Sequence, residues 1–101
     1  MKPEIRHIVA FSLKYPKDSA EAKKFIVDSR EILGAIPHVA AFDQCWQVSS
    51  KNDFDYVFVF DFMSEDDYKA YNAYPTHVQY VKERWDTEVT KFMETDLKEI
   101  G

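Results

Sequence analysis

Apolar and polar residues alternate along several short stretches of the chain, and this pattern predicts β-strands. The clearest case is residues 54–63, where aromatic residues occupy every second position and so point to one face of a strand. The opposite face carries Val57 and Val59 at its centre. A strand that is apolar on both faces needs a cover on both sides, so we expect it inside a sheet. The aromatic positions are Phe54, Tyr56, Phe58, Phe60 and Phe62.

Three further stretches are predicted as strands. Residues 5–14 alternate and are apolar on both faces, so this strand should lie centrally beside the aromatic one. In residues 40–49 one face is more polar than the other, as expected of a strand near an edge. Residues 90–97 show no helical stripe and complete the set. In the first of these strands one face carries His7, Val9, Phe11 and Leu13, and the other Ile8 and Ala10.

Two segments have the three-to-four-residue apolar spacing of amphipathic helices. The first follows Asp18, which can cap it together with Glu21, and ends near Gly34. The second follows Ser64, has acidic residues in its first turn, and breaks at Pro75, where a new helix can start. The apolar stripes are Ala22, Phe25, Ile26, Ser29, Leu33 and Ile36 in the first segment, and His77, Val81 and Trp85 after the break.

The predicted order is β-α-β-β-α-β, which is the ferredoxin-like arrangement of a single α+β domain over residues 1–101. Both helices then cover one face of a four-stranded antiparallel sheet. The other face, with Ile8, Ala10, Val57 and Val59, is left bare. We expect it to be buried against a twin sheet, giving a homodimeric α+β barrel. The alternative is a monomer with a modest apolar patch.

Composition excludes several classes of protein. The net charge is −5, and the Lys and Arg residues are scattered, which gives no support to nucleic-acid binding. No apolar run approaches the roughly 20 residues of a membrane span, so we expect no membrane partner. Cys45 is the single cysteine, which excludes a disulfide scaffold and favours a cytoplasmic location. With only two glycines, the chain has no phosphate-binding loop.

Three polar residues are candidates for chemistry. His7, Tyr71 and His77 should converge at one end of the gap between sheet and helices, where a small apolar ligand could bind. A helix N-terminus favours a neutral imidazole, so His77 is the candidate base, and Tyr71 presents its hydroxyl at the rim of the gap. The alternative is that all three only complete the packing. The histidines lack metal-ligand spacing, and we expect no cofactor. The candidate walls of the site are Val9, Phe11, Phe25, Ile26, Tyr56, Phe58 and Phe60.

Several short segments together resemble the stress-responsive A/B barrel (Dabb) family. They are Ile5–Phe11, Phe54-Asp55-Tyr56, Ile36-Pro37, Tyr71 followed by Tyr74–Val78, and Asp96. The resemblance spans nearly the whole chain and implies ferredoxin-like protomers that pair into a dimeric barrel.

The resemblance implies less about activity. A plant polyketide cyclase of this family uses a tyrosine and a histidine that match Tyr71 and His77, and His7 matches a histidine lining its pocket. This implies proton removal next to a carbonyl group, with the tyrosine hydroxyl stabilising the oxyanion. Bulky Phe58 and Phe60 would shrink a pocket for a long acyl chain. Two alternatives are a non-catalytic, stress-associated structural dimer and, by fold analogy alone, a monooxygenase-like protein.

Overall fold

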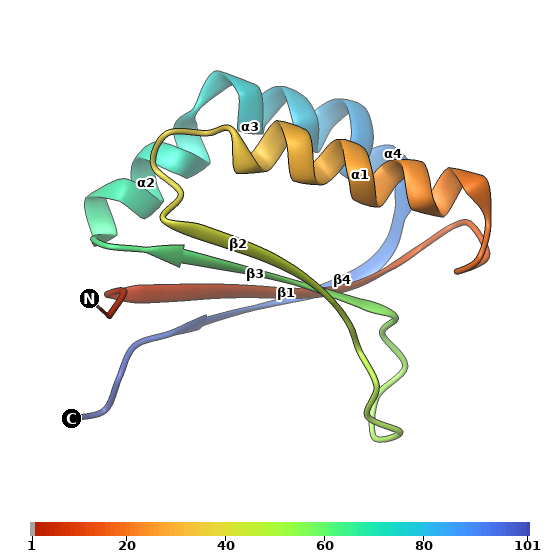
Figure 1. Ribbon diagram of the computed structural model, residues 1–101, viewed down its shortest axis with the longest axis horizontal. Helices are drawn as coiled ribbons and strands as arrows, with labels where there is room; N and C mark the ends of the chain where they lie inside the picture. The colour runs from red at the N-terminus through yellow and green to blue at the C-terminus, as the bar shows by residue number, and fades with distance from the viewer. Residues whose placement is uncertain (1) are drawn as a thin grey trace.

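The computed structural model describes residues 2–101 and shows a four-stranded antiparallel sheet with all helices on one face (Figure 1). The strands lie in the order β2-β3-β1-β4, so β1 and β3 are central, as predicted. The ferredoxin-like prediction is confirmed. The elements are β1 (Ile5–Leu13), α1 (Ala20–Gly34), β2 (Ala41–Trp46), β3 (Tyr56–Phe62), α2 (Glu65–Ala73), α3 (Pro75–Tyr80), the π-helical turn η1 (Val81–Trp85), α4 (Asp86–Glu88) and β4 (Val89–Leu97).

The connection between β2 and β3 is longer than the alternating pattern predicts. Residues 47–55 leave the strands, and side chains hold this loop together. The Gln47 side-chain amide donates to the carbonyl groups of Ser49 (3.1 Å) and Phe54 (2.9 Å). The Asn52 side-chain oxygen accepts from the Phe54 amide (3.1 Å). Phe54 therefore belongs to the loop, and the aromatic strand begins at Tyr56.

Serine residues cap the two main helical segments. The Ser64 hydroxyl accepts from the Asp67 amide (3.1 Å), which confirms the predicted start of α2. The prediction that Asp18 caps α1 is wrong. The N-cap is Ser19, whose hydroxyl accepts from the Ala22 amide (3.1 Å) and donates to the Pro16 carbonyl (2.7 Å). No helix in residues 2–101 combines the length and apolarity needed to cross a membrane.

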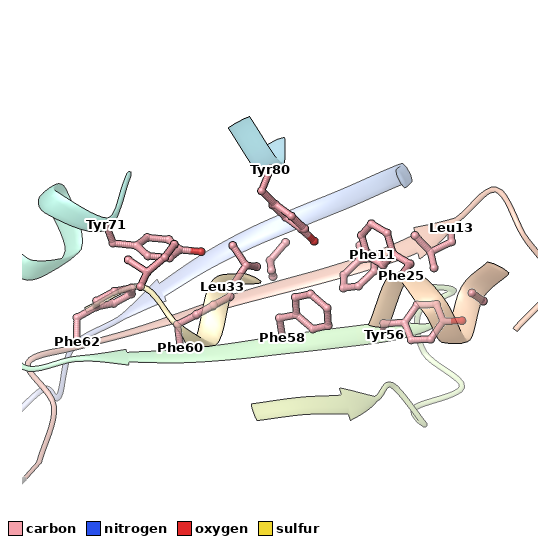
Figure 2. Packing of buried hydrophobic residues seen from close by; sticks show 13 residues of the cluster. Phe11, Leu13, Phe25, Leu33, Tyr56, Phe58, Phe60, Phe62, Tyr71 and Tyr80 are labelled. Atoms are coloured by element: carbon pink, nitrogen blue, oxygen red, sulfur yellow. The ribbon is translucent and has the colours of Figure 1, made fainter. Parts of the chain in front are cut away.

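An aromatic layer fills the space between the sheet and the helices. Figure 2 shows Phe58, Phe60 and Phe62 projecting from β3 toward the helices. Phe58 lies edge-on to Phe11 of β1, with ring centroids 4.7 Å apart, and Phe62 packs against Tyr71 of α2 at 5.1 Å. Because all these rings are buried, the core lies on this face of the sheet alone.

No helix of residues 2–101 covers the opposite face of the sheet (Figure 1). At its centre Ile8 pairs with Val59, and Ala10 pairs with Val57, and all four are only half-buried. Exposed Met93 of β4 continues this surface beside Ala10. The protomer therefore has an uncovered apolar surface over its central strands, as the two-sided apolar pattern predicts.

Candidate functional site

A cavity of about 270 Å³ lies between β3, β1 and β4 of the sheet and the helical segments α2, α3 and η1. It contains the three polar residues that the sequence predicts to converge. Its apolar walls are Val9, Leu33, Phe58, Phe60, Tyr80, Val81, Trp85 and Phe92, and its polar residues are His7, Tyr71, Asn72, His77, Asp86 and Glu94.

The break between α2 and α3 brings Tyr71 and His77 together. Tyr74 has an extended backbone (φ −63°, ψ 131°), and Pro75 starts the next helix. A residue before proline is biased away from helical conformation, so the Tyr74-Pro75 pair itself directs this change in chain direction. As a result the rings of Tyr71 and His77 lie with their centroids 4.4 Å apart.

The hydrogen bond of His77 fixes which of its ring nitrogens is free. Its Nδ1 lies 3.2 Å from the carbonyl oxygen of Asn72. Because a carbonyl can only accept, Nδ1 carries the proton and donates, and Nε2 retains its lone pair in the neutral ring. Burial lowers the pKa of His77 below its ordinary value of 6.5, despite the hydrogen bond to Asn72. His77 is therefore a neutral base at pH 7.

Tyr71 supplies a hydrogen-bond donor beside this base. Its side chain is only 2% exposed and packs against Phe60 and Phe62. Within residues 2–101 its hydroxyl makes no hydrogen bond to another protein group. Burial strongly raises the pKa of Tyr71, so the hydroxyl keeps its proton throughout the neutral range. The hydroxyl is therefore available to a ligand in the cavity.

His7 is held by two residues that the sequence analysis did not place in the site. Its Nδ1 lies 2.6 Å from one carboxylate oxygen of Asp96, its pairing neighbour on β4. The Tyr68 hydroxyl donates to the other Asp96 oxygen (2.9 Å) and lies 3.0 Å from His7 Nδ1. An ionised carboxylate only accepts, so Nδ1 of His7 carries a proton and donates it to Asp96. In both cavity histidines Nδ1 is thus held by a protein acceptor, and Nε2 is the ring nitrogen without a protein partner among the described residues.

The rim of the cavity is acidic. Asp86 and Glu94 are exposed lining residues, and no Lys or Arg lines the cavity. Negative charge at the mouth disfavours anionic ligands. The cavity is therefore suited to a small neutral molecule.

The predicted site residues fall into three groups. His7, Val9, Phe58, Phe60, Tyr71 and His77 line the cavity together. Phe11 and Phe25 are completely buried in the core, where each packs against neighbouring aromatic rings, and they do not line this cavity. Ile26 and Tyr56 line a different hollow, between α1 and β2.

The alternation of side chains along β4 could have placed Asp96 in the site, where the sequence prediction did not include it. Glu94 and Asp96 are two residues apart, so they share a face of the strand. Pairing of Asp96 with His7 puts that face toward the helices. In the part of the chain that the structure describes, no three His, Cys, Asp or Glu side chains gather as a metal site.

Solved structures provide the comparison for this fold and site. A Dabb-family protein with a ferredoxin-like fold from Mesorhizobium loti is 43% identical, with a TM-score of 0.94 over 96% of this chain and 97% of that protein. A protein of unknown function from Thermobifida fusca, described as dimeric and ferredoxin-like, is 19% identical, with a TM-score of 0.78 over 98% and 93%.

A hydroxynitrile lyase from Passiflora edulis is 18% identical, with a TM-score of 0.80 over 96% of this chain and 94% of the lyase. At such low identity the likeness shows the fold alone. A comparison with curated proteins found no match. The family described as "Stress responsive A/B Barrel Domain" matches residues 5–99, which is nearly the whole chain. The chain therefore belongs to the stress-responsive A/B barrel (Dabb) family.

Proposed function

We propose that the cavity binds a small neutral carbonyl compound and that His77 and Tyr71 perform acid–base chemistry on it. The observation that carries this proposal is the pairing of a neutral imidazole with an unpartnered tyrosine hydroxyl in one cavity. A base and a hydrogen-bond donor side by side are the two groups that enolate chemistry requires.

The proposed step begins with a C–H bond next to the ligand's carbonyl group. His77 Nε2 takes the proton, and the electron pair of that bond moves toward the carbonyl oxygen to form an enolate. The Tyr71 hydroxyl donates a hydrogen bond to this oxygen and stabilises its negative charge. If the enolate carbon then attacks a second carbonyl group, an aldol bond forms, and the proton on His77 returns to the new alkoxide.

His7 acts beside this pair as a positioned hydrogen-bonding group. Its link to Asp96 and Tyr68 fixes the ring and leaves Nε2 for a hydrogen bond with an enol or hydroxyl group of the ligand. The volume of about 270 Å³ lies below the usual range of roughly 300–1,000 Å³ for ligand pockets, which favours a compact substrate. Phe58 and Phe60 close the wall where a long chain would need to extend.

The proposal includes a homodimer formed through the bare face of the sheet. Support comes from the half-buried apolar centre of that face and from the description of the Thermobifida relative as dimeric. A large exposed apolar patch on a soluble domain is typical of an interface. Two such faces would cover each other about a two-fold axis.

Exchange of ketone protons tests the chemistry without knowledge of the natural substrate. Acetone and acetophenone are incubated with the protein in D2O, and loss of the protons next to the carbonyl is followed by proton NMR. The wild type is expected to accelerate exchange above buffer. His77→Ala should remove about 10²-fold or more of that acceleration, the usual contribution of a general base. Tyr71→Phe should remove about tenfold, the value of one hydrogen bond.

The third histidine provides the matched control. His38 lies outside the cavity, where its ring contacts Tyr74 and its Nδ1 lies 3.4 Å from Asp67. His38→Ala should leave the exchange rate unchanged. Equal rates for wild type and His77→Ala, with both proteins folded, would show that His77 only completes the packing.

A further inference from the structure

A second hollow, of about 420 Å³, lies between α1 and the edge strand β2. It is lined on the helix side by one stripe of α1, in which Lys23, Val27 and Arg30 follow each other at helical spacing. On the strand side its wall is Trp46 of β2, which stacks on Tyr56 of β3 with ring centroids 5.1 Å apart. We call this hollow the α1–β2 groove.

The charge at this groove is opposite to that of the protein as a whole. The chain has a net charge of −5, yet the residues that line the groove include Lys17, Lys23 and Arg30 and no carboxylate. Lys17 has a distant partner in Asp55 (3.9 Å). Lys23 has no ion-pair partner within residues 2–101. The groove therefore offers positive charge that the protein does not neutralise.

One end of the groove is closed by a polar strap. The Gln44 amide nitrogen donates to the Ile26 carbonyl (2.7 Å), and its oxygen accepts from Arg30 Nε (2.9 Å). Trp46 lies two residues further along β2, roughly 7 Å beyond Gln44. The apolar part of the groove thus runs from this strap toward the end where Lys17 and Tyr56 lie.

An unpartnered hydroxyl lies at that other end. Tyr56 is buried, and its hydroxyl has no hydrogen-bond partner among the described residues. A buried donor without a partner costs free energy. Tyr56 lines the groove together with Lys17 and Lys23, but its hydroxyl is covered by protein atoms, so the polar groups open to a ligand at this end are the two exposed ammonium groups.

We infer that the α1–β2 groove binds an amphipathic monocarboxylate, a molecule with a medium-length apolar body and one terminal carboxylate. The apolar body lies along Ile26, Val27 and Trp46, with the Gln44 strap as its limit. The carboxylate lies near the ammonium groups of Lys17 and Lys23. This site is separate from the acidic cavity of the histidines, with which it shares only Phe58 as a lining residue.

The two tryptophans of the chain report the two hollows separately. Trp46, 60% exposed, lines the groove, and Trp85 lines the histidine cavity. In a Trp85→Phe variant, octanoate should produce a saturable change in Trp46 emission. Octan-1-ol, which has the same chain without the charge, should bind at least tenfold more weakly, and octylamine should not bind. The two indole N–H signals in NMR spectra of the wild type give the same readout without a substitution.

Charge variants complete the test. Lys23→Gln, alone or with Arg30→Gln, should weaken octanoate binding at least tenfold, and both side chains are exposed, so the fold is retained. Lys82→Gln, at an exposed lysine of η1 that lines neither hollow, is the matched control and should change nothing. The inference is overturned if Trp46 does not respond, if octylamine binds as well as octanoate, or if only Trp85 responds. Because the ketone-exchange assay reports the histidine cavity, either result can fail without the other.

Discussion

Replacing Phe58 with alanine should destabilise the protein by about 3 kcal/mol, at the low end of the range for a buried aromatic residue. The ring is 1% exposed and contacts Phe11 and Phe42 at centroid distances of 4.7 and 5.1 Å, so most of its apolar surface is lost from the core. It also borders both the histidine cavity and the α1–β2 groove. The space left by the ring would join these hollows and admit water, which reduces the penalty for an empty cavity.

Phe11→Ala is the matched control, because Phe11 is equally buried and borders neither hollow. It should cost about 4–5 kcal/mol, the upper part of the same range. Urea denaturation followed by circular dichroism measures both values. For a domain of this size, the Phe58 variant should melt roughly 12–24 °C below the wild type. If Phe58→Ala costs as much as Phe11→Ala, the ring is packed as ordinary core and the two hollows are not separated by it alone.

Three further changes test other parts of the structure. Val59→Asp should dissociate the proposed dimer or unfold the protein in sedimentation experiments, because an unpaired buried carboxylate costs several kcal/mol, whereas Val78→Asp on exposed α3 should not. In urea denaturation, acidification below pH 6.5 should destabilise the wild type more than His77→Ala. The pKa of His77 is lower in the folded protein than in the unfolded chain, so the unfolded chain binds the proton first as the pH falls. The difference in the free energy of unfolding between the two proteins should stop growing below the folded pKa of His77. Arg84→Met should cost about 2 kcal/mol, since Arg84 bonds Asp28 (2.8 Å) and Glu88 (2.6 Å) in a partly exposed network.

Each of these predictions has a clear contrary result. A wild type that sediments as a monomer at micromolar concentration contradicts the role of the bare face. Identical pH profiles for wild type and His77→Ala mean that His77 does not lose solvation on folding. An Arg84→Met variant as stable as the wild type would show that the network joining α1, η1 and α4 is a surface feature without net stabilising effect.

The fold could be predicted because its strongest signals are local and repeat along the chain. Alternate aromatic positions in β3 define the buried face, and the apolar pair Val57 and Val59 indicates the second face. The Tyr74-Pro75 break likewise determines that Tyr71 and His77 face each other. Each of these patterns depends on residues only a few positions apart.

The parts that could not be predicted depend on long-range pairing or on competition between neighbours. Asp96 reaches His7 only through the β1–β4 register, across 89 positions of the chain. Ser19 rather than Asp18 caps α1 because only Ser19 also bonds Pro16. Apolarity alone does not distinguish Phe25, enclosed by other rings, from Ile26, one position later and lining the groove.

Nitrogen NMR of the histidine rings tests most directly whether His77 presents a free base to the cavity. Long-range proton–nitrogen spectra identify the protonated ring nitrogen and follow it with pH. At pH 7 His77 should be neutral with its proton on Nδ1, and its titration midpoint should lie below 6.5. A protonated ring at pH 7, or a neutral ring with the proton on Nε2, would leave no lone pair facing the ligand and would contradict the proposed chemistry.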